Sequence, residues 1–171
     1  MTITIIAATT ASRVIADSKS PGMLWHNKAE LAHFKRETIG KTCIAGLKTA
    51  IAMPILKERE IYVLIDGMSP RCDISNYPEN YHFLLSETID AQLCMREFID
   101  SDDEIMVIGG AKTYAAFIDS ASKAIISTIF DSNGDIVGDV YLPNFIGCWK
   151  LVKTKVDVCG EFMTQWFERV S

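Results

Sequence analysis

Apolar residues along the chain fall into short continuous runs, separated by polar segments, glycine and proline. Such runs predict strands that are covered on both faces of a sheet. In the first two thirds of the chain they cover residues 3–8, 41–45, 60–65, 81–85 and 105–108. Towards the end, β-branched and aromatic residues predict strands over 123–130, 140–142, 149–158 and 162–170, with Gly160 turning the last two into a hairpin.

Several segments between these strands have the spacing of apolar residues that is typical of helices. Residues 27–38 are predicted to form a helix with Asn27 as its N-cap and with Leu31 and Phe34 in its apolar stripe. Shorter helices are predicted over residues 47–53, 86–98 and 111–119. Residues 9–24 are polar and contain proline and glycine, so we expect a long loop, and loops of that length are usually functional.

Strands and helices therefore alternate through most of the sequence. Alternation of this kind implies right-handed crossovers. We expect an α/β fold whose central, mostly parallel sheet has about eight strands, with helices on both faces and an antiparallel C-terminal hairpin at one edge. Ligands of such sheets bind at the carboxyl ends of the strands.

Composition narrows the class of protein further. The 171 residues, 49% of them hydrophobic, predict one globular domain over residues 1–171. A net charge of −5 without a run of Lys or Arg disfavours nucleic-acid binding. No apolar stretch is long enough for a membrane span and the start has no basic signal-peptide region, so a cytoplasmic protein is expected. The five cysteines have no C-x-x-C spacing and the histidines no metal-binding spacing, so we expect neither disulfides nor a metal.

Two junctions between a strand and a helix are candidate anion sites. They are Gly46-Leu47-Lys48-Thr49 and the run from Gly109 to Tyr114, each with glycine followed by Lys and Thr. Glycine lets a phosphate approach the backbone, and the first N–H groups of a helix are free to bind it. Neither junction has the spacing of a Walker loop or of a Rossmann fingerprint. Two junctions in one chain favour a ligand with more than one phosphate.

Glu30 allows two interpretations. It stands three residues after Asn27, so it can complete a capping box at the start of the helix. It also borders the apolar stripe, where burial would raise its pKa and a protonated heterocycle could balance its charge.

Ordered blocks across nearly the whole chain resemble dihydrofolate reductases of the bacterial and phage type. The sequence Ala29-Glu30-Leu31-Ala32-His33-Phe34-Lys35-Arg36 matches that family's A-[DE]-L-x-x-F-K-x helix, and residues 105–110 with Tyr114 match its strand and Gly-Gly turn. The other similar blocks are residues 5–8 with 13–15, Met23-Leu24-Trp25, Gly138-Asp139 followed by Leu142-Pro143, and residues 166–168.

The resemblance implies an NADPH-dependent enzyme that reduces 7,8-dihydrofolate to 5,6,7,8-tetrahydrofolate. Hydride would pass to pterin C6 and a proton to N5, with a mobile loop over residues 16–24 that excludes water. It implies a role in one-carbon metabolism and nucleotide biosynthesis, inhibition by diaminopyrimidine and pteridine antifolates, and a monomer. Two alternatives remain: the related riboflavin-pathway pyrimidine reductase, and a catalytically weak or idle dinucleotide-binding protein of the same fold.

The resemblance also implies roles for individual residues. Glu30 would bind the pterin, Trp25 would hold a water near it, and Ser127 or neighbouring Thr128 would bond to the carboxylate. The other implied substrate residues are Ile6, Leu31, Phe34, Lys35, Arg59 and Ile108. The implied cofactor residues are Ala8, Ile15, Ala16, Gly46, Leu47, Lys48, Thr49, Ile65, Asp66, Gly109, Gly110, Ala111, Lys112, Thr113 and Tyr114, with a cis peptide between the two glycines.

The sequence departs from the family pattern where the 2′-phosphate of NADPH would bind. Leu47 stands where an arginine is usual, and Ile65 and Asp66 stand where serines are usual. Lys48 is then the main cation left, and Asp66 suits a ribose hydroxyl better than a phosphate. We therefore expect a reduced preference for NADPH over NADH.

Overall fold

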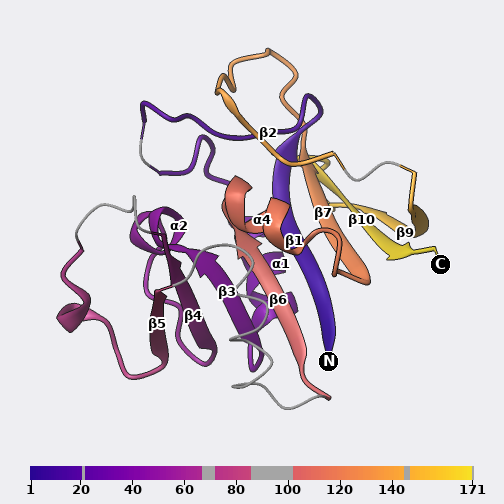
Figure 1. Cartoon of the computed structure of the whole chain (residues 1–171). Helices are drawn as coiled ribbons and strands as arrows, with labels where there is room; N and C mark the ends of the chain where they lie inside the picture. The colour runs from indigo at the N-terminus through magenta and orange to yellow at the C-terminus, as the bar shows by residue number, and fades with distance from the viewer. Residues whose placement is uncertain (21, 67–71, 86–101, 145–146, 171) are drawn as a thin grey trace.

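The computed structural model describes residues 1–20, 22–66, 72–85, 102–144 and 147–170, and its core is one eight-stranded sheet. The strand order is β5-β4-β3-β6-β1-β7-β10-β9 (Figure 1). In sequence order the strands are β1 (Thr2–Thr10), β3 (Thr42–Gly46), β4 (Glu60–Ile65), β5 (Tyr81–Leu85), β6 (Glu104–Gly109), β7 (Lys123–Ile129), β9 (Trp149–Val156) and β10 (Phe162–Arg169).

The pairing confirms the predicted sheet. From β5 to β7 every neighbouring pair is parallel. β10 then pairs antiparallel with both β7 and β9, which gives the expected edge. Gly160 turns this last hairpin with a φ of +68°, a conformation that favours glycine, and its N–H donates to the carbonyl of Asp157.

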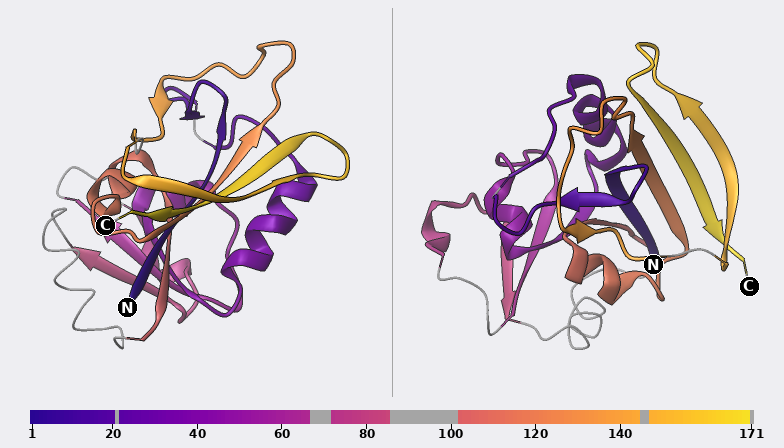
Figure 2. Two further views of the ribbon diagram at one scale, coloured as in Figure 1. Left: turned by 90° about the vertical axis from the view of Figure 1, so that its right-hand side faces the viewer. Right: turned by 90° about the horizontal axis from the view of Figure 1, so that it is seen from above.

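Helices cover both faces of the sheet, as predicted. The helices are α1 (Lys28–Thr38), α2 (Leu47–Ala52) and α4 (Ala111–Phe117), with a 3-10 turn η1 (Ile74–Asn76). α1 lies behind the sheet and α4 in front of it (Figures 1 and 2). Side chains alternate accordingly: Ile5 and Val107 pack with Phe117 of α4, whereas Ile6 and Met106 pack on the other face.

The predicted loop over residues 9–24 was wrong in its first half. β1 continues to Thr10, and β2 (Val14–Ala16) pairs antiparallel with β8 (Val140–Tyr141) in a separate two-stranded sheet. Local hydrogen bonds explain the difference, because the Thr10 hydroxyl accepts from the Val14 N–H and the Thr9 hydroxyl donates to the Val14 carbonyl. Such side-chain bonds let polar residues form a tight, ordered turn.

The predicted helix over residues 86–98 lies outside the described residues. Among the helices that the structure describes, none is long and apolar enough to cross a membrane.

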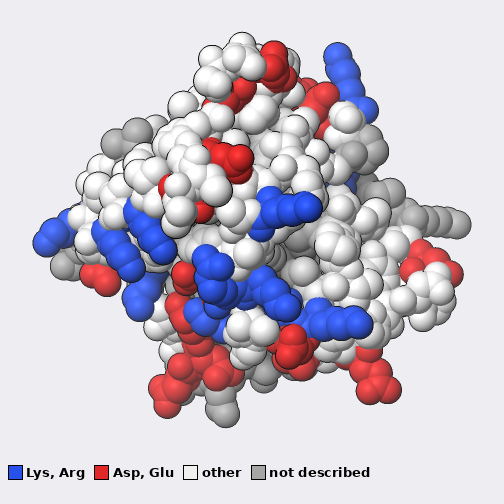
Figure 3. Space-filling view, turned by 180° about the vertical axis from the view of Figure 1, so that it is seen from behind, with Lys and Arg blue, Asp and Glu red and all other residues white. Residues whose placement is uncertain are grey.

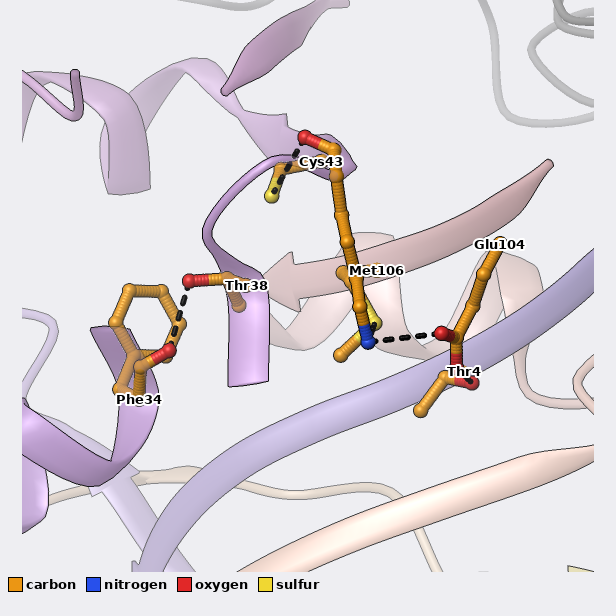
Figure 4. Close-up of polar contacts among 7 residues, drawn as sticks. Thr4, Phe34, Thr38, Cys43, Glu104 and Met106 are labelled. Carbon is orange, nitrogen blue, oxygen red and sulfur yellow. Dashed lines mark hydrogen bonds and ion pairs between the residues drawn. The ribbon is translucent and has the colours of Figure 1, made fainter. Parts of the chain in front are cut away.

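A polar network joins the amino-terminal ends of β1, β3 and β6 (Figure 4). Lys41, just before β3, forms an ion pair with Glu104 at 2.8 Å, and the Thr4 hydroxyl of β1 donates to the same carboxylate. Burial alone would raise the pKa of Glu104, but the hydrogen bonds from Lys41 and Thr4 hold it below its usual value. The network holds these three central strands together at the end of the sheet opposite the predicted ligand site.

Phe117 tests the packing of α4. Its ring is 1% exposed in the core beneath the helix, so Phe117→Ala should lower the free energy of unfolding by about 3–5 kcal/mol. Urea unfolding measures the loss. The exposed Leu151→Ala is the control and should change stability by about 0.5 kcal/mol or less. A loss below about 1 kcal/mol for the phenylalanine variant would contradict the buried position.

Candidate active site

The two predicted anion junctions lie against each other at the carboxyl ends of β3 and β6, which are neighbours in the sheet. A Cβ placed on Gly46 would lie 2.8 Å from the Thr113 hydroxyl oxygen, and one on Gly110 would lie 3.0 Å from that of Thr49. The Gly109–Gly110 peptide is cis, as the resemblance implies. The two junctions therefore pack closely, with the glycine backbone of each junction against a threonine hydroxyl of the other, an approach that a Cβ would hinder.

Glu30 is buried in the structure, near the amino-terminal end of α1. Its backbone N–H donates to the Asn27 side chain at 2.9 Å, so the N-cap forms as predicted. The reciprocal bond of a capping box, from the Glu30 carboxylate, does not form. That carboxylate has no hydrogen-bond or ion-pair partner among the described residues, although the side chain is only 5% exposed. Burial raises its pKa to about 7.

Tyr114 brings the second junction towards Glu30. Its hydroxyl donates to the Ile6 carbonyl at 2.9 Å. Burial, followed by the nearby charge of Glu30, raises the pKa of Tyr114. The predicted wall residues share this region: Ile6 and Ile108 are buried, Phe34 packs in the same cluster, and Leu31 is half-buried.

Trp25 is a second group with an unsatisfied polar atom. Its indole Nε1 is buried and has no acceptor among the described residues. A donor in this state fits a bound water or ligand, because a buried N–H without a partner costs free energy.

The expected bond from Ser127 or Thr128 to the Glu30 carboxylate is not among the hydrogen bonds of the described residues. Ser127 pairs with Ala8 across the sheet, and its hydroxyl is 3.1 Å from that of Thr164 on β10. The serine therefore satisfies its hydroxyl within the sheet, and Thr128 makes no bond to Glu30 either.

Arg59 is buried just before β4, with an exposed fraction of 6%. Its guanidinium donates to the Thr38 hydroxyl at 2.9 Å and to the Lys57 carbonyl at 2.7 Å, with a longer contact of 3.5 Å to the Lys35 carbonyl. No carboxylate pairs with it in the part of the chain that the structure describes. Buried charges are normally paired, so this one fits an anionic ligand group. The Lys35 side chain is exposed.

The segment after β2 is tied to the segment before β8. Asp139 accepts from the Ser18 N–H at 2.6 Å and from its hydroxyl at 2.5 Å. A Cβ on Gly138 would lie 2.8 Å from a methyl of Val14, so these two segments are closely packed. The predicted residues Ile15 and Ala16 belong to β2, just before Ser18, and are half-buried. Sequence reasoning did not single out Ser18 and Asp139, although Gly138-Asp139 is one of the similar blocks.

Among the described residues, few cations lie where a 2′-phosphate was expected. Leu47 is buried in the core, and Lys48 is exposed. The Lys112 ammonium is 3.2 Å from the carboxylate of Asp66, which follows Ile65 at the end of β4. The positive charge of Lys112 is thus partly neutralised.

The raised pKa of Glu30 predicts how the unliganded protein responds to pH. The native state takes up a proton at about pH 7, whereas an unfolded glutamate does so near 4.5. Stability from this group is fully present below about pH 4.5 and is lost as the pH rises through 7, by up to about 3 kcal/mol. Glu30→Gln removes the titration. The free energy of unfolding of the variant, measured with urea, should therefore rise relative to that of the wild type between pH 5 and 8. Parallel stability curves would show that the carboxylate is not desolvated.

Comparison with known proteins agrees with this geometry. The family model described as dihydrofolate reductase matches residues 2–163. The chain is 30% identical over 145 residues to the dihydrofolate reductase of Haemophilus influenzae, covering 84% of this chain and 79% of that protein. It is 31% identical over 157 residues to that of Buchnera aphidicola from Baizongia pistaciae, covering 91% and 86%, and 27% identical over 149 residues to the type 3 enzyme of Salmonella typhimurium, covering 85% and 81%. With its sheet, its glycine junctions and its buried glutamate, the chain belongs to the dihydrofolate reductase family.

Proposed function

We propose that the protein reduces 7,8-dihydrofolate to 5,6,7,8-tetrahydrofolate with NADPH. The observation that carries the proposal is the Glu30 carboxylate, which is buried and unpartnered among the described residues, at the ligand edge of a sheet of this family. A 2-amino group and a ring N–H of a pterin can satisfy both of its oxygens. The names of the relatives favour this reaction over the pyrimidine reductase and the idle protein.

The substrate ring is proposed to lie between apolar side chains. Ile6, Leu31, Phe34 and Ile108 supply the walls for the pterin and the aminobenzoyl group. Trp25 directs its free indole N–H at a water near the ring. Few polar groups and many apolar contacts are the usual composition of a small-molecule pocket.

The acidic tail of the substrate is proposed to bind Arg59. Its guanidinium is held by Thr38 and Lys57 and has N–H groups left for a carboxylate. Lys35 assists from the surface of α1, and its flexibility makes it the weaker partner.

The nicotinamide cofactor supplies the hydride. The chain is proposed to hold it at the two glycine junctions, with Ala8, Ile15 and Ala16 towards the nicotinamide. The junction residues with this role are Gly46, Leu47, Lys48, Thr49, Gly109, Gly110, Ala111, Lys112, Thr113 and Tyr114, with Ile65 and Asp66 towards the adenosine.

Glu30 also contributes to the chemistry. A pKa of about 7 leaves its carboxyl half ionised at neutral pH, and the ionised form stabilises positive charge that develops on the pterin as N5 takes up a proton. Burial strengthens this field. The loop over residues 16–24 is proposed to close over the nicotinamide and exclude water, and the hydrogen bonds from Ser18 to Asp139 hold one part of it.

In the cell, we propose that the protein acts as a cytoplasmic, monomeric, single-domain enzyme. It would supply tetrahydrofolate to one-carbon metabolism and nucleotide biosynthesis. Diaminopyrimidine and pteridine antifolates should bind it, because their protonated rings match the Glu30 carboxylate.

Glu30→Gln tests the proposed reaction. The variant should lose about a hundredfold or more in the rate of hydride transfer, followed as loss of absorbance at 340 nm, because its neutral amide cannot stabilise the pterin cation. Its affinity for NADPH should stay nearly unchanged. The exposed Glu79→Gln is the matched control and should behave like the wild type. An equal loss of hydride transfer and of NADPH affinity, or undiminished dihydrofolate reduction by the Glu30 variant, would refute the assignment.

Cofactor preference is a separate prediction. Because Leu47 is buried and Asp66 places a carboxylate beside Lys112, kcat/KM for NADPH should exceed that for NADH by less than about a thousandfold, or about 4 kcal/mol. Asp66→Asn should shift the preference towards NADPH, whereas Lys48→Met should shift it towards NADH. The stabilisation of the protein by NADP+ and by NAD+ gives a second readout. A larger preference would contradict the prediction.

A further inference from the structure

Helix α1 buries three polar residues, beside the partly buried Leu31 and Phe34. They are Glu30, His33 and Thr38. A helix that packs on a sheet normally presents an apolar stripe there. The position of Glu30 therefore depends on how these polar residues are held.

Both ends of α1 are fixed by hydrogen bonds. At the beginning, the Asn27 amide donates to the carboxylate of Glu161, just before β10, at 2.7 Å. At the end, Arg59 donates to the Thr38 hydroxyl, which itself donates to the Phe34 carbonyl at 2.7 Å.

The middle of α1 is fixed by the ring of His33. Its imidazole meets Trp166 of β10 edge-on, with ring centroids 5.8 Å apart, and Phe162 at 6.4 Å. The side chain is 6% exposed. His33 follows Glu30 by about one helical turn, so this contact with β10 lies close to Glu30 along the helix.

The imidazole makes no hydrogen bond in the described part of the structure. Its Nε2 is buried without a partner, and its Nδ1 is 3.7 Å from a carboxylate oxygen of Glu37, beyond hydrogen-bond length. The ring contacts therefore hold the imidazole, with the Glu37 carboxylate beside its Nδ1.

Charges of both signs surround His33. Glu37 on α1 favours a proton on the imidazole, Arg36 on α1 and Lys155 on β9 oppose it, and Asp157 lines the same small cavity of about 40 Å³. This face of the molecule carries a band of basic side chains (Figure 3). Burial is the main cause that lowers the pKa of His33, against the effect of Glu37.

We propose that His33 is a positioning residue for Glu30 and that it works only in its neutral form. A proton on the imidazole places a positive charge beside Nε2, which is buried without a partner among the described residues, and hydration of this charge loosens the packing of α1 on Trp166 and Phe162. A shift of α1 displaces Glu30 from the substrate. The inference rests on the proposed function and adds that substrate binding weakens at low pH.

The effect on stability has a definite sign. An unfolded histidine binds a proton near pH 6.5 and the folded one only at lower pH, so stability is lost as the pH falls below about 6.5. Glu30 responds in the opposite direction, since its raised pKa favours the folded state in acid. His33 and Glu30 can therefore be distinguished by the direction of their pH dependence.

His33→Phe is the decisive variant, because phenylalanine keeps the ring contacts and cannot titrate. Between pH 7.5 and 5, the melting temperature of the wild type should fall by about 2 °C or more relative to the variant. Over the same range, the affinity of the wild type for a 2,4-diaminopyrimidine should fall at least about threefold relative to the variant, because this ligand reports the position of Glu30. His82→Asn, an exposed histidine on β5, is the control and should follow the wild type.

Parallel profiles for the wild type and His33→Phe in either measurement would overturn the proposal. If His33→Phe does not fold, the wild type alone decides: its His33 ring resonance should titrate below pH 6.5 together with faster amide exchange in α1, and titration without that exchange would refute the positioning role. Failure of the proposed function is distinguishable, since then the diaminopyrimidine would bind at no pH while the melting profiles still differ.

Discussion

The rest of the site depends on one constraint, a carboxylate that is kept out of water without a protein partner among the described residues. Glu30 acquires its raised pKa from burial alone, so any feature that lets water reach it would remove the property. The N-cap at Asn27 fixes the backbone of this residue, and the sheet supplies the apolar surroundings. The N-cap of the helix and the packing of the sheet are therefore both needed to place this one side chain.

The parallel sheet provides the second requirement, which is to bring distant glycines together. Gly46 and Gly110 are far apart in the sequence, yet β3 and β6 are neighbours and end at the same edge. Adjacent parallel strands joined by crossovers always end on the same side of the sheet, so the loops that follow them meet there. The contact of Tyr114 with Ile6 then links this edge to the region of Glu30.

The sequence was sufficient to predict the elements that depend on periodicity and local chemistry. All eight strands of the main sheet and the cap of α1 were predictable, because apolar runs and capping residues act over a few positions. The turn between β1 and β2 was not, since it depends on threonine hydroxyls that bond to the backbone. Neither were the partner of Ser127 or the pair of Ser18 and Asp139, because these contacts join residues distant in the chain. For Glu30 the two interpretations were both partly right: the cap forms through its backbone, and its side chain remains available.

Several residues assigned to the proposed site have unsatisfied polar groups, and their cost has a common explanation. The Glu30 carboxylate, the indole N–H of Trp25 and the guanidinium of Arg59 each lack a full set of partners among the described residues. Buried polar groups in this state destabilise a fold, and a ligand that satisfies them returns that free energy on binding. His33 is also unsatisfied, but its ring packs between α1 and β10. A substrate at Glu30 supplies no partner for the imidazole, so the role proposed for His33 depends on its packing against Trp166 and Phe162.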